Sequence, residues 1–226
     1  MELRRPKARR VPPPPLPEPE PAPPPPPLKR YGHLIPEGMI NWFENAEALL
    51  PLVEDRKPKI AIEVGSWLGS SAIQIARLLQ TWGGTLICVD HWHGDTSWWA
   101  QEGMPLQIQT SFETFRFNLA RHGVGNVIVH RGRSQDVARV MPKRSAGLIY
   151  IDASHDEMNV RADIAAWWPI VKPGGILAGD DYGSTRWTGC TVAWDTCGLP
   201  VHTERGPGVK GLVWVEKPRR RWRWLW

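Results

Sequence analysis

Apolar residues fall into two alternating patterns between residues 59 and 179 of this chain. Short continuous apolar runs predict buried strands at residues 59–64, 85–90, 127–130, 148–151 and 175–179. Apolar side chains at three- and four-residue steps predict helices between them, at residues 70–79, 106–122 and 134–141, with a further helical stretch after residue 152. Strands that alternate with helices form a parallel sheet joined by right-handed crossovers. We therefore expect an α/β fold with helices on both faces of a sheet.

The two flanks of this region carry elements of a different kind. Apolar residues at helical spacing predict a helix at residues 38–50, which Pro51 should end because proline lacks an amide hydrogen. Residues 201–204 and 211–216 read as two short strands so close together that they should form a hairpin. One edge of the sheet is then antiparallel. We expect a turn-rich loop at residues 183–200.

Composition divides the chain into three parts. Residues 1–28 hold 13 of the 23 prolines and are predicted to be a proline-rich disordered tail. The alternative is an extended rod that binds a proline-recognising partner. Residues 29–216 have the composition of one globular domain, and residues 217–226 form a basic tail rich in Trp and Arg.

The net charge of +5 belongs to the tails, because residues 1–30 and 216–226 each carry +4 and the middle carries about −3. The C-terminal alternation of Arg and Trp is typical of an edge strand or flexible tail, while contact with nucleic acid or a membrane surface is the alternative. Three cysteines are too few for a disulfide framework, and no apolar run reaches the roughly 20 residues of a membrane span. We expect a cytoplasmic protein.

Carboxylates follow two strands of the predicted sheet. Asp152 ends one apolar run, and Asp180 and Asp181 end the next. Ligands of open parallel sheets bind at the carboxyl ends of the strands. Three carboxylates gathered there would repel one another without a cation, and hard oxygen ligands favour Mg²⁺ or Mn²⁺. The alternatives are that Asp180 caps a loop or that Asp152 pairs with Arg161.

A glycine-rich turn follows the first strand. Gly65 and Gly69 bracket it, Glu63 precedes it, and Asp90 ends the second strand, where an acid binds ribose hydroxyls in Rossmann-like folds. A dinucleotide site has the pattern G-x-G-x-x-G, which is absent here. Because Glu63 would repel phosphate and attract an ammonium group, the turn favours S-adenosylmethionine. The alternative is a turn that serves packing alone.

Five segments together resemble the class I S-adenosylmethionine-dependent methyltransferases, and more closely the macrocin and mycinamicin sugar O-methyltransferases. They read EVGSWLGSSA, VDHW, GRSQD, IDASHDEMNVRADI and KPGGILAGDDY. The resemblance spans residues 38–216 and departs from the family motif at Ala153, where glycine is usual. It implies a Rossmann-like, seven-stranded, mostly parallel sheet of order 3-2-1-4-5-7-6.

The resemblance also implies roles for individual residues. The cofactor is expected at Glu63, Gly65, Ser66 and Gly69 for its methionine end, at Asp90 for its ribose, and at Ser134 and Gln135 for its adenine. Metal ligands are expected at Asp152, Asp180 and Asp181, with Asp152 and His155 as catalytic residues and His155 as the general base.

These patterns predict an S-adenosylmethionine-dependent O-methyltransferase with Mg²⁺ or Mn²⁺ as a second cofactor. The expected partner is a small-molecule hydroxyl acceptor, such as a sugar, and a homo-oligomer is left open. One alternative is a nucleic-acid-associated protein or methyltransferase that uses its basic tails. A second alternative is a nicotinamide-dependent oxidoreductase on a similar sheet.

Overall fold

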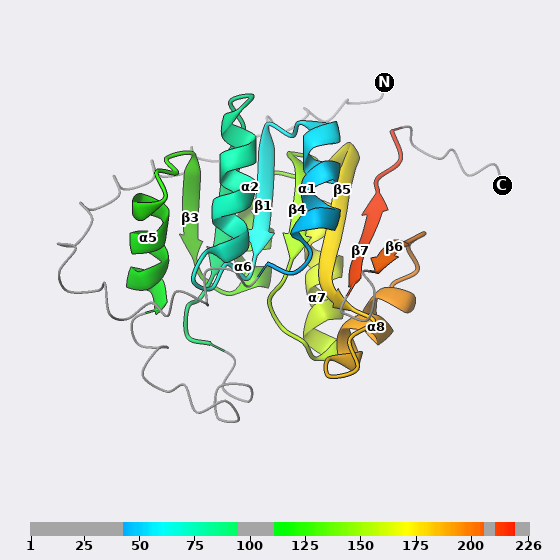
Figure 1. Cartoon of the computed structure of the whole chain (residues 1–226). Coiled ribbons are helices and arrows are strands. Elements are labelled where there is room, and N and C mark those ends of the chain that lie inside the picture. Colours follow the sequence, from blue (N-terminus) through cyan, green and yellow to red (C-terminus); the bar gives the residue numbers. More distant parts are fainter. Residues whose placement is uncertain (1–42, 95–110, 206–210, 220–226) are drawn as a thin grey trace, which may run out of the picture.

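Seven strands form one sheet in the order β3-β2-β1-β4-β5-β7-β6 (Figure 1). The structure is a computed structural model that describes residues 43–94, 111–205 and 211–219. Strands β1 to β5 are parallel, and β7 is antiparallel to both β5 and β6. The predicted fold and its antiparallel edge are confirmed. The strands are β1 Ile60–Val64, β2 Thr85–Asp90, β3 Val127–Arg131, β4 Ala146–Ile151, β5 Val171–Tyr182, β6 His202–Arg205 and β7 Gly211–Glu216.

Helices cover both faces of the sheet (Figure 1). Helices α1, α2 and α5 pack their apolar residues on one face, and α6, α7 and α8 pack on the other. None of the described helices is long and apolar enough to cross a bilayer. The helices are α1 Ala46–Arg56, α2 Ser70–Gln80, α5 Ser111–Arg121, α6 Ser134–Val140, α7 Glu157–Trp167 and α8 Thr188–Asp195.

Strand β4 shows how the sequence builds the two layers. All six of its residues are buried. Leu148 and Tyr150 belong to the core on the α1, α2 and α5 side, while Ile149 and Ile151 belong to the core on the α6, α7 and α8 side. Successive side chains of a strand point to opposite faces, so a strand covered on both sides is apolar throughout.

The prediction that Pro51 ends the first helix is wrong, because α1 continues through it to Arg56. Proline at this position removes one backbone hydrogen bond. Leu49 and Val53, on either side of it, are at most 1% exposed in the core beneath α1. Burial of two such side chains contributes roughly 3–6 kcal/mol, which is at least as large as the roughly 3 kcal/mol that a proline costs inside a helix.

Helix α8 occupies part of the segment that was predicted to be a turn-rich loop. Its inward face consists of Cys190, Ala193 and Trp194, which are all buried. These residues lie at positions i, i+3 and i+4, which is a helical pattern. The pattern covers only one turn, which makes the helix hard to predict from sequence.

Strand β5 is longer than predicted and includes the Lys-Pro-Gly-Gly segment. The pairing with β4 jumps from Ala146–Val171 to Leu148–Ile176. Gly174, with φ of +76°, lies inside this irregularity. The segment is therefore a bulge within a strand, a position that tolerates proline.

Four parallel strands end in line at one edge of the sheet. The register pairs Val64 with Val89 and with Ile151, and Ile151 with Gly179. The residues that follow them, among them Asp152, therefore emerge side by side at that edge. The proline-rich tail and most of the basic tail lie outside the described residues, but Lys217 still contacts the domain, donating from Nζ to the Trp168 carbonyl at 2.6 Å.

Candidate active site

A cavity of about 860 Å³ opens at the edge of the sheet where β1, β2, β4 and β5 end. Ligand sites of drug-sized molecules usually fall in the same range of a few hundred to a thousand Å³. Of the residues expected to bind the cofactor, Gly65, Ser66, Asp90, Ser134 and Gln135 line this cavity. Asp152, His155, Asp180 and Asp181 also line it. The residues expected to bind the cofactor and those expected to bind the metal or act in catalysis therefore line one cavity.

The turn after β1 follows an unusual backbone path. Gly65, Trp67 and Gly69 all have positive φ values, of +91°, +43° and +93°. A Cβ on Gly65 would lie 1.9 Å from the carbonyl oxygen of Asp152. Two features therefore require glycine at this position: the close approach of the Asp152 backbone after β4 and the positive φ value.

Asp90 fixes this turn and also lines the cavity. Its Oδ2 accepts the backbone amide of Trp67 at 2.9 Å, and its Oδ1 accepts that of Trp92 at 2.7 Å. The indole of Trp92 in turn donates to the carbonyl of Trp67 at 2.8 Å. A carboxylate can accept about four hydrogen bonds. Asp90 can therefore hold the turn and still accept from the two hydroxyls of a ribose.

Glu63 lies beneath the turn and does not line the cavity. Its side chain is fully buried, and Ser71 donates to its Oε1 at 2.5 Å while Cys88 Sγ lies 3.7 Å from its Oε2. Burial raises the pKa of Glu63 from 4.5 to about 7. Gly69 also lies outside the cavity lining and is the N-cap residue of α2. These two predicted cofactor residues thus shape the turn from below and do not face the cavity.

Replacing Glu63 with glutamine is expected to stabilise the folded chain at pH 8 and to change little at pH 4. The raised pKa means that the folded state binds more protons than the unfolded state between about pH 4.5 and 7. The contribution of Glu63 to the free energy of unfolding therefore falls across that window, by on the order of 3 kcal/mol, and is level above it. Urea unfolding of both proteins from pH 4 to 8 measures the difference. If the free energies of unfolding of the two proteins differed by the same amount at every pH, the raised pKa of Glu63 would be contradicted.

A second buried acid, Asp163, lies at the other side of the cavity and was not predicted. It projects from α7, is 2% exposed, and lines the cavity. Its Oδ1 accepts from the hydroxyl of Ser134 and from Nε2 of Gln135, the latter at 2.6 Å. Asp163 thus connects α7 to the start of α6, where the adenine is expected.

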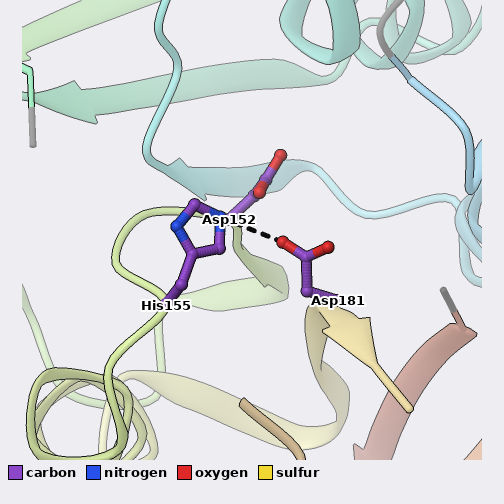
Figure 2. Close-up of side chains that lie close together, drawn as sticks. All are labelled: Asp152, His155 and Asp181. Atoms are coloured by element: carbon purple, nitrogen blue, oxygen red, sulfur yellow. Dashed lines mark ion pairs between the residues drawn. The ribbon is translucent and has the colours of Figure 1, made fainter. Parts of the chain in front are cut away.

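At the opposite end, Asp152, His155 and Asp181 converge (Figure 2). One ligand atom from each lies within 4.8 Å of the others. His155 Nε2 is 3.0 Å from Asp181 Oδ2, and Asp181 is 4% exposed. The imidazole also stacks on the Trp187 ring, with centroids 4.3 Å apart.

The structure does not bring Asp180 into this cluster. Its Oδ2 accepts from the Tyr150 hydroxyl at 2.7 Å, and its Oδ1 accepts from Asn45 Nδ2 and from the amide of Asp181. Asp180 hydrogen-bonds toward α1, whereas Asp181, whose φ is +59°, lies against His155. Because Asp180 also lines the cavity, its role as a metal ligand stays a prediction.

The cluster fits a divalent cation by its chemistry. Oxygens on opposite sides of Mg²⁺ are about 4 Å apart, given bonds of about 2.0–2.1 Å, and the donor atoms here are similarly spaced. Two carboxylates and an imidazole suit Mn²⁺ and Fe²⁺ better than Mg²⁺, because imidazole prefers transition metals. Asp152 and Asp181 are the residues that would hold it through their carboxylates, and His155 lies close enough to be a third donor when it is not acting as a base.

A family model described as a methyltransferase domain matches residues 62–182. The matched segment runs from the glycine turn to the carboxylate cluster. The chain belongs to this methyltransferase family. A search of curated proteins by sequence finds no match.

Solved structures of methyltransferases share the fold of this family member. The O-methyltransferase TomG from Streptomyces achromogenes, in complex with SAM, is 16% identical with a TM-score of 0.56 over 76% of this chain and 79% of its own. An O-methyltransferase from Bacillus cereus, in complex with SAH, is 18% identical with a TM-score of 0.55 over 81% and 82%. A proposed rRNA methylase from Clostridium thermocellum is 10% identical with a TM-score of 0.56 over 76% and 97%. The fold is therefore shared by methyltransferases with different acceptors.

Proposed function

We propose that the chain is an S-adenosylmethionine-dependent O-methyltransferase that acts on a hydroxyl of a sugar or another small molecule and uses a divalent cation. One observation carries the proposal. A single cavity joins the glycine turn and Asp90 to the cluster of Asp152, His155 and Asp181. A methyl donor at one end and a hydroxyl acceptor at the other would then lie next to each other.

The residues at the donor end suit S-adenosylmethionine, which when bound supplies a methyl group activated by its sulfonium. The first turn of α2 carries no acidic residue, and Ser70 and Ser71 from that turn line the cavity. The free amides at a helix start favour a carboxylate such as that of the methionine end. The remaining lone pairs of Asp90 suit the ribose hydroxyls.

The acceptor end offers a base that is already oriented. His155 Nδ1 is buried and makes no hydrogen bond within the described residues, so proton exchange falls to Nε2. Asp181 lies 3.0 Å from that nitrogen and stabilises the imidazolium that forms when His155 takes the hydroxyl proton. A divalent cation held by Asp152 and Asp181 would supply Lewis acidity that lowers the pKa of the acceptor hydroxyl, and would leave the lone pair of His155 Nε2 for the proton.

Proximity supplies the remainder of the rate enhancement. Holding two reactants in an aligned geometry contributes roughly 7–11 kcal/mol. The walls of the cavity come partly from strand ends and helix starts and mostly from the connections that leave them. Because the methyl group is activated before it binds, placement of donor and acceptor and removal of the hydroxyl proton are what remains for this chain to supply.

The charge of the cavity argues against a nucleic-acid acceptor. Among the described residues that line it, the basic side chains are Arg133 and Arg186. The acidic ones are Glu44, Asp90, Asp152, Asp156, Asp163, Asp180 and Asp181. A polyanion would be repelled by such a surface. The acidic lining instead suits a positively charged donor and a cation.

Methyl transfer from labelled S-adenosylmethionine tests the proposal. The full chain is incubated with vicinal diols, monosaccharides, catechols and, separately, RNA, with added Mn²⁺ or Mg²⁺ and with a chelator. We expect label in a hydroxyl compound and a fall in rate with chelator. Label in RNA alone would contradict the acceptor class, and full activity in chelator would contradict the role of the cation.

A further inference from the structure

Basic residues gather at the edge of the sheet opposite the cavity. The parallel strands begin at that edge, and β7, which is antiparallel to β5, ends there (Figure 1). The segments that flank the strands on this side are residues 57–59, 81–84, 122–126, 141–145, 168–170, 196–201 and 217–219. They contain no acidic residue and six basic ones, which we call the basic edge: Lys57, Lys59, Lys143, Arg144, Lys217 and Arg219.

The residues of the basic edge lie close together because they flank neighbouring strands. Residues 57–59 precede β1, residues 143–144 precede β4 and residues 217–219 follow β7, and β5 lies between β4 and β7. Lys172, at the start of β5, adds a further charge, and its Nζ lies 3.3 Å from where a Cβ on Gly147 would be. With about 4.8 Å between strands, these four strands span roughly 15 Å.

Little negative charge neutralises the basic edge. Five of its side chains are exposed, and Lys217 is half-buried. Within the described residues, Arg219 is the one member that pairs with an acid, Glu216, at 4.0 Å, and Glu216 lies closer to Arg56, at 2.8 Å. Burial and the nearby charge of Arg144 lower the pKa of Lys217. A positive patch of this kind attracts an anionic surface.

Contacts of Lys217 and Arg219 fix the place where the basic tail leaves the domain. The Gly174 amide donates to the Lys217 carbonyl at 2.7 Å, and the Lys217 amide donates to the Gly175 carbonyl at 2.8 Å. Lys217 Nζ also lies 4.9 Å from the centroid of the Trp168 ring, and Arg219 Nε lies 3.0 Å from where a Cβ on Gly174 would be. Residues 220–226, which read RRWRWLW, therefore follow directly on the basic edge.

We infer that the basic edge and the basic tail together form a surface that binds an anionic phospholipid bilayer. Lys and Arg side chains are attracted to anionic headgroups, and Trp side chains favour the headgroup region of a bilayer. The tail supplies both kinds of residue. Because the cavity opens at the other edge of the sheet, a chain bound in this way keeps its cavity open to water. The inference goes beyond the proposed function and does not depend on it.

Two features favour a bilayer over a nucleic acid as the partner. Four of the five residues 222–226 are large and apolar, and one of them is Leu225. The boundary between headgroups and acyl chains accommodates Trp and Leu alike, whereas stacking on bases uses aromatic rings. A nucleic acid on the basic edge would also lie on the opposite side of the sheet from the cavity, where it could not be the methyl acceptor.

Co-sedimentation of the full chain with lipid vesicles tests the inference. Vesicles of phosphatidylcholine mixed with phosphatidylserine are compared with vesicles of phosphatidylcholine alone, each with and without added RNA. We expect binding to the anionic vesicles to be at least about tenfold tighter. The preference should be lost near 1 M salt, where the Debye length is about 3 Å, and RNA should not displace the chain. Equal binding to both vesicles, displacement by RNA, or binding to neither vesicle would overturn the inference.

A variant of the basic edge shows whether the folded domain takes part. Lys59→Gln with Lys143→Gln removes two exposed charges and should weaken binding to the anionic vesicles by roughly tenfold to thirtyfold, at about fivefold for each charge. Arg116→Gln with Arg161→Gln removes the same charge from α5 and α7 and should bind like the wild type. Equal losses in the two variants would mean that net charge alone, and not the basic edge, sets the affinity.

A variant of the tail tests the second half of the surface. Trp222→Ser with Trp224→Ser leaves every described residue and the net charge unchanged, and it should lose most of the binding to anionic vesicles. Thermal unfolding at the wild-type temperature shows that each variant is folded. Wild-type binding by a folded variant of either the basic edge or the tail would overturn the claim that the two act together.

Discussion

Replacing Asp181 with alanine is expected to lower the rate of methyl transfer about a thousandfold, which is within the range for impaired general-base catalysis, here by His155. The change removes the carboxylate 3.0 Å from His155 Nε2 and one of the three donors of the cluster. The affinity for S-adenosylmethionine should change by less than about threefold, because Asp90 and the glycine turn remain. Steady-state kinetics and calorimetry of the same protein measure both quantities.

Two controls separate lost chemistry from lost structure. Asp136→Ala removes an exposed acid that pairs with Arg139 on α6, outside the cavity lining, and should leave the rate unchanged. The thermal stability of the Asp181 variant should be equal to or higher than that of the wild type, since a buried charge is removed from a crowded site. An unchanged rate in the Asp181 variant would show that the cluster takes no part in catalysis.

Replacing Gly65 with alanine is expected to cost at least about 4 kcal/mol of folding free energy or to prevent folding. The new Cβ would lie 1.9 Å from the carbonyl oxygen of Asp152, and φ at this position is +91°. The new Cβ would overlap a backbone atom, so no side-chain rotation could remove the clash. The clash is removed only if β1 and β4 separate at the edge that forms the site. Urea unfolding, with circular dichroism as the probe, measures the loss.

Gly123→Ala is the matched control for this change. Gly123 also has a positive φ, of +67°, but nothing lies within 4 Å of its Cβ position. Its replacement should cost only about 1 kcal/mol, the usual effect of a left-handed backbone position. Equal losses in the two variants would mean that φ alone, and not the contact with Asp152, makes Gly65 necessary.

The sheet was predictable because its strands are covered on both faces. Each parallel strand contains a short apolar run, and Asp90, Asp152 and Asp181 mark three of the strand ends at the cavity. Polar residues at the ends of buried strands are a strong signal, since they show both the boundary and the edge that carries the site. The hairpin of β6 and β7 was equally clear from its short spacing.

The errors have local physical causes. Pro51 is tolerated because Leu49 and Val53 anchor the helix around it, which a rule about proline alone does not consider. Asp180 and Asp181 are adjacent and both line the cavity, but only Asp181 lies against His155. Which of the two contacts His155 depends on the irregular pairing at the end of β5, between Gly179 and Tyr182. That irregularity has no clear sequence signal.

Asp163 was missed although a signal was present. Val160, Ile164 and Trp167 form the buried stripe of α7, and Asp163 falls within the same stripe. An acid on an apolar helix face is a reason to look for partners. Its partners Ser134 and Gln135 come from α6, far away in sequence, so the hydrogen bonds themselves could not be foreseen.

Calorimetric titration of the full chain with S-adenosylmethionine is the most direct test of the account, with NAD⁺ as the competing ligand. The account predicts one S-adenosylmethionine site with a Kd between about 1 μM and 1 mM, the usual range for enzyme ligands, and no heat from NAD⁺. Absence of S-adenosylmethionine binding at millimolar concentration, or binding of NAD⁺ in its place, would contradict the central claim that this cavity holds a methyl donor.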